Sequence, residues 1–311
     1  MYIYPKSVGH RGDFGLSEEV PLFAPGNIVI DSITELYQEY GSNKATDYSI
    51  KFSTCSEFSA YFNHVSGLST DLDQAFHAAS PRCGDTYSTG GGSFTSCEAR
   101  LGISIPAGTE IGTAAGENTL SVALDLGARD SRSTVASFAN DSRWRSDQYN
   151  VVCPLDYFAE DVKKQLYDKI EHAESSYPGC GTIYQDVAGR AQGVWFSRKG
   201  GPTHPEDAHL ALVNDNVNAF KQVFSVGTSG PVSTGEYHFE PVEISPVNRM
   251  FDSTQLNEAY CYEVTDRFGG DVDHTILIEM PADDELRLAN RSAETCGEGP
   301  WEMLDYKTYV R

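Results

Sequence analysis

The chain has 311 residues, of which 40% are apolar and 22% charged, a balance typical of a globular protein rather than a disordered or fibrous one. Its 45 acidic and 23 basic residues give a formal charge of −22. This charge disfavours nucleic acid and anionic membranes as partners, because both require a cationic surface. The apolar runs are only a few residues long, so we expect no segment to span a membrane.

The residue pattern predicts a mainly β protein with two helical segments. Short runs of Val, Ile, Tyr and Phe alternate with Gly, Pro, Asn and Ser, as in strands joined by turns. The first helix is expected after an N-cap in residues 69–71. Leu72 and Phe76 follow there at helical spacing, until Pro81 ends the pattern.

A longer helix is predicted within residues 153–178, where Phe158, Val162, Leu166 and Ile170 form one apolar stripe. This connecting helix divides the chain into an expected N-terminal domain, residues 1–152, and an all-β domain of unknown role, residues 179–311. The second domain is expected to be a β sandwich or barrel, because short strands recur along it. The expected strands are residues 193–196, 210–213, 222–226, 260–264 and 275–280.

One internal repeat stands out in the first domain. Residues 20–30 resemble residues 103–112, and each segment reads as a strand, a turn of Pro, Ala and Gly, and a second strand. Glycine tolerates a left-handed backbone and proline pre-sets the bend, so both residue types suit such a turn. Two such units could pair as the halves of a small sandwich.

The seven cysteines include no C-x-x-C pair, which excludes a zinc ribbon. Cys83 and Cys97 bracket a Gly- and Ser-rich stretch. The sequence leaves open whether they close this loop as a disulfide or are two separate buried thiols. A disulfide would stabilise the fold by about 3 kcal/mol and indicate an oxidising compartment. Residues 1–5 show neither the basic nor the apolar region of a signal peptide, so we expect either a cytosolic protein or one whose leader has been removed.

Five features follow one another in the first domain: residues 9–15, the turn unit at 20–30, the strand and His at 48–68, the turn unit at 103–112 and the strand at 120–127. In this order they resemble the lysostaphin/LytM-type zinc endopeptidases, whose fold is the duplicated hybrid motif. The similarity covers roughly residues 8–130, and its best segments are Tyr61-Phe62-Asn63-His64-Val65 and Ile105 to Gly112. The resemblance implies a duplicated-hybrid-motif sandwich in this domain.

The resemblance also implies a site, which this sequence only partly retains. The family binds zinc through a first His and Asp and the last His of an H-x-H strand. His10 and Asp13 match the first pair, although they lie one residue closer together than is usual. The H-x-H strand falls at Ala123-Leu124-Asp125, so both histidines are absent. The remaining candidate metal ligands are His10, Asp13 and Asp125, and His64 is the candidate general base or transition-state stabiliser.

These departures favour a non-catalytic, peptidase-like protein of the cell envelope or the extracellular space, which binds a peptide, a glycan or a protein and needs no cofactor. The alternative is an active zinc endopeptidase that cleaves cell-wall peptides with the three candidate ligands. In the second domain, residues 203–209 contain His204 and His209 and read either as a divalent-metal site or as a solvated loop.

Overall fold

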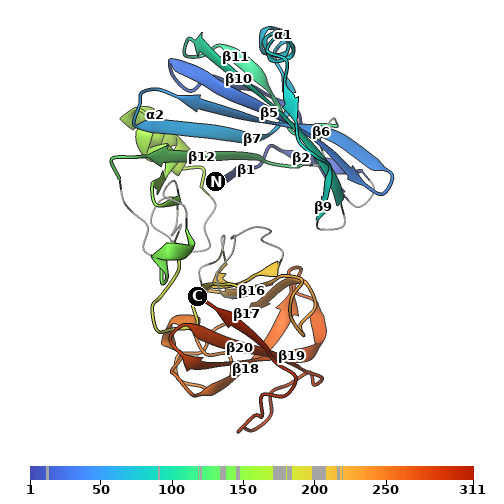
Figure 1. The fold of residues 1–311 in the computed structure, drawn as a ribbon, viewed down its shortest axis with the longest axis vertical. Helices are drawn as coiled ribbons and strands as arrows, with labels where there is room; N and C mark the ends of the chain where they lie inside the picture. The colour runs from blue at the N-terminus through green and yellow to red at the C-terminus, as the bar shows by residue number, and fades with distance from the viewer. Residues whose placement is uncertain are drawn as a thin grey trace. The chain divides into compact units, whose positions relative to one another are not determined.

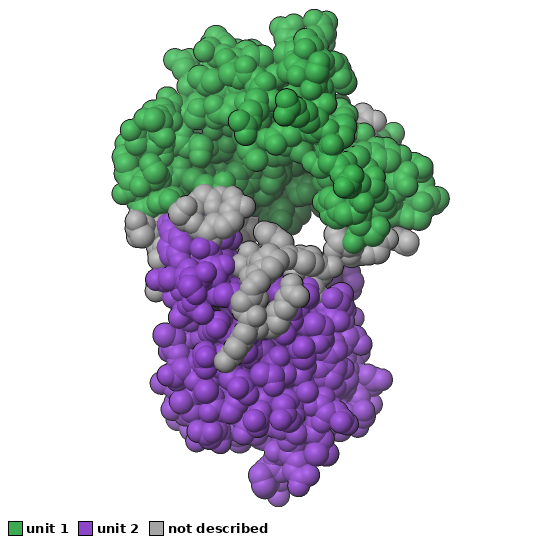
Figure 2. Space-filling view, viewed as in Figure 1, with its two compact units in different colours: residues 1–135, 150–163 green, residues 136–149, 164–311 purple. Residues whose placement is uncertain are grey.

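The computed structural model describes residues 1–11, 14–89, 92–117, 119, 121–133, 138–144, 148–170, 180, 184–197, 208–215, 218 and 220–311. These residues form two compact units, the first made of residues 1–135 and 150–163 and the second of residues 136–149 and 164–311 (Figure 2). Both units are built from antiparallel sheets, so the predicted mainly β class is confirmed. No helix in this part of the chain is long and apolar enough to cross a lipid bilayer.

The first unit is built on one large antiparallel sheet, in which the strand order is β1-β12-β7-β6-β5-β10-β8 (Figure 1). Four short strands extend it: β11 pairs with β7, β4 with β11, β13 with β12, and β9 with β10. The strands of this sheet are β1 (Tyr2–Ile3), β4 (Val20–Phe23), β5 (Ile28–Tyr40), β6 (Asn43–Ser53), β7 (Phe58–Leu68), β8 (Arg82–Cys83), β9 (Tyr87–Thr89), β10 (Gly92–Ile105), β11 (Glu110–Ala114), β12 (Leu124–Asp130) and β13 (Val151–Val152). A separate hairpin consists of β2 (Ser7–Arg11) and β3 (Phe14–Ser17).

The two similar turn segments lie side by side and pair with each other. Ile30 of β5 is opposite Ile103 of β10, and Leu22 of β4 is opposite Gly112 of β11. Between the strands, Ala24 N donates to Thr109 O at 2.8 Å and Gly108 N donates to Ala24 O at 2.9 Å. Each turn therefore satisfies backbone groups of the other. Residues 20–30 and 103–112 thus pair as predicted, but within one sheet and not as the two halves of a sandwich.

One face of this sheet is apolar and the other is polar, as the alternation of side chains along a strand requires. The apolar face carries, among others, Ile50 and Phe52 of β6 and Leu124 and Leu126 of β12. Helix α1 (Thr70–Ala78), at the predicted position, packs Leu72 and Phe76 into this core. The opposite face is left for the polar residues of the same strands.

The second unit is a single antiparallel sheet whose strands follow one another in chain order, from β14 to β21. Its strands are β14 (Gly193–Trp195), β15 (Leu210–Asn214), β16 (Gln222–Val226), β17 (Gly235–Phe239), β18 (Ala259–Asp266), β19 (Asp271–Ala282), β20 (Glu285–Arg291) and β21 (Lys307–Val310). The five predicted strands of this region are confirmed.

The two ends of this sheet meet at one bridge, so the unit is a nearly closed barrel rather than a sandwich. Phe196 N donates to Val310 O at 2.7 Å, and Val310 N donates to Phe196 O at 2.8 Å. Side chains fill the interior, and four aromatic rings with centroids 4.9–5.8 Å apart form its centre: Phe224, Phe239, Phe251 and Tyr262. Closure of the sheet leaves β14 and β21 without a free edge at this point.

After β13 and before β14 in the sequence, the chain forms a short 3₁₀ turn, Pro154–Tyr157, and helix α2 (Glu160–Tyr167). Two more 3₁₀ turns, Asp141–Arg143 and Phe251–Ser253, lie in the second unit. Helix α2 is shorter than the predicted helix, and Phe158 and Ile170 of the predicted apolar stripe lie outside it. Residues 171–178 of the predicted helix lie outside the described part of the chain. The division of the sequence at residues 152 and 178 stays a prediction.

Each unit contains a disulfide between two of its own cysteines. Cys83 and Cys97 form the disulfide that the sequence left open, across the facing strands β8 and β10. Cys261 is bonded to Cys296, a link from β18 to the segment after β20. Cys55 is a free, exposed thiol.

Candidate functional site

The candidate site lies on the polar face of the first sheet, where β7 carries a bulge. Phe62 is opposite Ile50 and Val65 is opposite Tyr48, so Asn63 and His64 together face the single residue Ser49. Phe62 and Val65 are both buried in the core, which turns the two residues between them to the polar face. Bulges are common beside functional sites, because the extra residue re-aims a side chain.

His64 takes up the bulge in a left-handed backbone conformation, with φ at 63°. Residues with a Cβ enter this region at an energetic cost of about 1–2 kcal/mol, although histidine does so more often than most. The surrounding sheet holds this conformation in place. Such local strain is typical of positions where a side chain must point in one direction.

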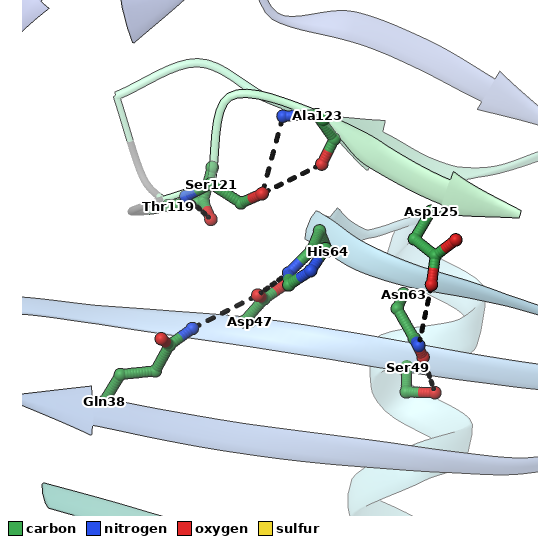
Figure 3. Close-up of polar contacts among 9 residues, drawn as sticks. All are labelled: Gln38, Asp47, Ser49, Asn63, His64, Thr119, Ser121, Ala123 and Asp125. Carbon is green, nitrogen blue, oxygen red and sulfur yellow. Dashed lines mark hydrogen bonds and ion pairs between the residues drawn. The ribbon is translucent and has the colours of Figure 1, made fainter. Parts of the chain in front are cut away.

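A buried carboxylate fixes the imidazole of His64. Its Nδ1 lies 2.7 Å from Oδ2 of Asp47, whose side chain is 4% exposed while that of His64 is 36% exposed. Gln38 Nε2 donates to the same Asp47 oxygen at 3.1 Å (Figure 3). A carboxylate only accepts, so Nδ1 carries the proton and Nε2 is the ring nitrogen left to meet a ligand.

The hydrogen bond to Asp47 raises the pKa of His64 above its ordinary value. Burial of the ring opposes this effect, and the negative charges of Asp47 and Asp125 add to it. The imidazolium form is therefore favoured over a wider pH range than in an isolated histidine.

Asp125 lies beside this pair, on the neighbouring strand β12. It is opposite Asn63 in the sheet, and Asn63 Nδ2 donates to Asp125 Oδ2 at 3.4 Å. Ser49 Oγ donates to Asn63 Oδ1 at 2.6 Å (Figure 3). The Met1 nitrogen lies 3.1 Å from Asp125 Oδ1. Both carboxylate oxygens of Asp125 thus have a partner within the chain. Ser49, Asn63, His64 and Asp125 are called the polar row below.

The loop before β12 borders the polar row. Ser121 Oγ donates to Ala123 O at 2.9 Å, and Ser121 N donates to Thr119 Oγ1 at 3.0 Å (Figure 3). These contacts hold Thr119, Ser121 and Ala123 together directly before β12. Ala123 itself is buried and carries only a methyl group, which neither binds a metal nor transfers a proton.

The four residues predicted from the sequence have different outcomes. His64 and Asp125 lie on the same face of adjacent strands. Asp13 lies outside the described residues. The backbone of His10 lies in β2 opposite Gly15, and its side chain is not part of the described structure. The proposed convergence of His10, Asp13 and Asp125 stays a prediction.

The sequence reasoning missed Asp47, Gln38, Asn63 and Ser49. Asp47, Ser49 and Lys51 alternate with core residues of β6, and this period of two indicates a shared face. Nothing in the alternation shows that Asp47 is buried, because that depends on neighbouring strands. In the second half, residues 203–207 lie outside the described residues, and His209 Nδ1 accepts a hydrogen bond from Ser197 N.

Tyr61 lies at the edge of the polar row and depends on a glycine in the next strand. A Cβ on Gly127 would lie 2.2 Å from Cζ of Tyr61, so the tyrosine ring occupies the space that a side chain at 127 would fill. Burial, followed by the charge of Asp125, raises the pKa of Tyr61. The glycine therefore allows an aromatic ring to lie flat beside the carboxylate.

Replacing Gly127 with alanine is expected to displace the Tyr61 ring and to destabilise the first unit by about 1–2 kcal/mol, as overpacking does. Urea unfolding measures the stability, and the Tyr61 ring resonances report the displacement. Gly26→Ala is the matched control, since a Cβ there meets nothing within 4 Å. Equal stability of the two variants would contradict the role given to Gly127.

No family model, curated protein or solved structure matches this chain. The likeness to lysostaphin/LytM-type endopeptidases therefore stays a prediction. Among the described residues, no three His, Cys, Asp or Glu side chains lie close enough together to hold a metal ion. Of the three predicted ligands, only Asp125 has a described side chain, and both of its oxygens have other partners. The described residues alone do not form a zinc site.

Proposed function

We propose that the first unit is a non-catalytic, peptidase-like binding module that recognises a peptide, a glycan or a protein through the polar row. The observation that carries the proposal is the identity of the residues at positions 123 and 125. Ala123 offers no imidazole where the resemblance places one, and Asp125 supplies a carboxylate in place of the last imidazole. A buried Asp47 meanwhile holds His64 in one orientation, as a recognition surface requires.

An extracellular or cell-envelope location is part of this proposal. The disulfides Cys83–Cys97 and Cys261–Cys296 support it, because such bonds persist in oxidising compartments. A cell-wall polymer is then the most accessible partner. No resident metal or cofactor is needed for recognition by hydrogen bonds.

The test combines hydrolysis with binding. Purified protein is incubated with a pentaglycine peptide and with peptidoglycan, with and without added zinc, and we expect no zinc-dependent cleavage. We expect the protein to co-sediment with insoluble peptidoglycan, and His64→Ala to weaken this association about tenfold, because the fixed imidazole is central to the polar row. Lys44→Ala is the control, since Lys44 is an exposed side chain of the same unit whose partner is Glu39. Zinc-dependent cleavage of either substrate would overturn the proposal.

The alternative is an active zinc endopeptidase, which the Asp47–His64 pair favours. A carboxylate that orients a histidine is the arrangement of a general base and its positioning group. His10, Asp13 and Asp125 would hold the metal, and zinc would supply a water activated for attack. Metal analysis decides between the two functions: the alternative requires about one bound divalent ion per chain, which His10→Ala releases.

A further inference from the structure

Two exposed tyrosines stand beside the polar row. Tyr2 is 57% exposed and Tyr4 is 68% exposed, and their ring centroids lie 6.4 Å apart with planes tilted by 43°. Tyr2 is directly opposite Asp125 in the sheet. Its ring is also within 23° of parallel to the His64 imidazole, with centroids 6.5 Å apart. The tyrosines therefore continue the polar row at the edge of the sheet.

The polar row offers both hydrogen-bond donors and hydrogen-bond acceptors. Asp125 only accepts, whereas the amide of Asn63 and the hydroxyl of Ser49 both donate and accept. Nε2 of His64 adds a further group, and the buried Asp47 fixes its direction. A ligand that matches this row must also both donate and accept along its length.

This combination distinguishes between ligand classes. An anion would meet the carboxylate of Asp125 on a chain with a formal charge of −22. A peptide that adds to a sheet as an extra strand binds through its backbone, whereas the groups of the polar row are side chains that project from the sheet face. A sugar carries hydroxyl groups that donate and accept, and its ring has C–H faces that pack on aromatic rings. Tyrosine suits such a contact, because it joins an apolar ring to a polar tip.

We infer that this face of the first unit binds a neutral oligosaccharide, with Tyr2 and Tyr4 packed against sugar rings and Asn63 and Asp125 bonded to sugar hydroxyls. The inference rests on the proposed function and narrows its partner from a peptide, glycan or protein to a glycan.

The experiment measures binding of the full chain to three soluble probes by calorimetry: the hexamers of β-1,4-linked N-acetylglucosamine, β-1,4-linked glucose and α-1,4-linked glucose. We expect at least one to bind. Tyr2→Ala and Tyr4→Ala should each weaken that binding by about tenfold, the usual effect of losing a central aromatic contact. Tyr4→Phe should retain most of it, because the ring is kept. Tyr87→Ala is the control, since Tyr87 is 50% exposed on β9 of the same unit.

Three outcomes would overturn the inference: no binding to any of the three hexamers, equal losses in Tyr87→Ala and Tyr4→Ala, or binding of a pentaglycine peptide but not of the sugars. Thermal unfolding of each variant shows that a loss of binding is not a loss of fold. These outcomes are separate from those of the hydrolysis test. A protein that binds peptidoglycan but none of the hexamers keeps the proposed function and loses the glycan inference. Zinc-dependent cleavage removes the proposed function whether or not sugars bind.

Discussion

Replacing Asp47 with alanine is expected to destabilise the first unit by about 2–4 kcal/mol and to lower the pKa of His64. The carboxylate of Asp47 accepts hydrogen bonds from Gln38 and His64 at a position that is 3% exposed. Its removal leaves a buried amide donor and an imidazole N–H without an acceptor, and unsatisfied buried donors are costly. Urea unfolding measures the first effect, and an NMR titration of the imidazole resonances measures the second.

The effect of Asp47→Ala is expected to depend on pH, with a sign that follows from His64. The folded-state pKa of His64 is raised above its unfolded value. The stability from its pairing with Asp47 is therefore fully present below the unfolded pKa of about 6.5 and is lost as the pH rises through the folded pKa. The stability difference between the native chain and the variant should be larger at about pH 5.5 than at about pH 9.

Asp31→Ala serves as the control for this experiment. Asp31 is an exposed carboxylate on β5 that accepts a hydrogen bond from Ser53, and its loss should change the stability by less than about 0.5 kcal/mol. The His64 resonance is assigned as the one missing from His64→Asn, because asparagine also tolerates a left-handed backbone. An unchanged His64 titration in Asp47→Ala would contradict the arrangement described for the site.

Replacing Trp195 with alanine is expected to destabilise the second unit by about 3–5 kcal/mol, the usual cost of removing a large buried aromatic ring. Trp195 is fully buried in the barrel, and its Nε1 donates to Ala191 O at 2.7 Å. The Arg311 guanidinium lies 3.9 Å from the ring centroid and donates to Val187 O and Gln192 O. Burial lowers the pKa of Arg311 to about 10, so its charge is held at a desolvated position.

The variant Trp195→Ala would leave both a cavity and a buried cation without its aromatic contact. Denaturant unfolding followed by the remaining tryptophan fluorescence measures the loss. Phe268→Ala is the matched control, because Phe268 is 83% exposed in the same unit. Equal stability of the two variants would contradict the stabilising role given to the buried Trp195 ring.

The polar row explains why a bulge in β7 matters for recognition. Without the extra residue, the alternation of β7 would turn His64 into the core, where Phe62 and Val65 now lie. The bulge places Asn63 and His64 on the same face, next to Asp125 on β12 and Ser49 on β6. The distance between adjacent strands therefore sets the distance between neighbouring groups of the row.

The sequence determined the local features of this protein. The periodicity of its apolar residues predicted the mainly β class, helix α1 and five strands of the second unit, because side-chain direction repeats every two residues in a strand and every 3.6 in a helix. The likeness of residues 20–30 to 103–112 predicted their pairing, since two similar strand–turn–strand units can bury the same face. The resemblance to the lysostaphin/LytM-type endopeptidases, not this periodicity, singled out His64 and Asp125.

Only the tertiary structure decided which residues surround them. Asp47 and Gln38 lie 17 and 26 positions before His64 in the numbering of the chain, and the strands β5, β6 and β7 bring the three together. The closure of the second sheet into a barrel likewise depends on contacts between Phe196 and Val310. The local pattern of residues fixes the direction of a side chain. Its burial and its hydrogen-bond partners depend on strands that are distant in the sequence. The contact that anchors His64 to Asp47 therefore follows only from the assembled sheet.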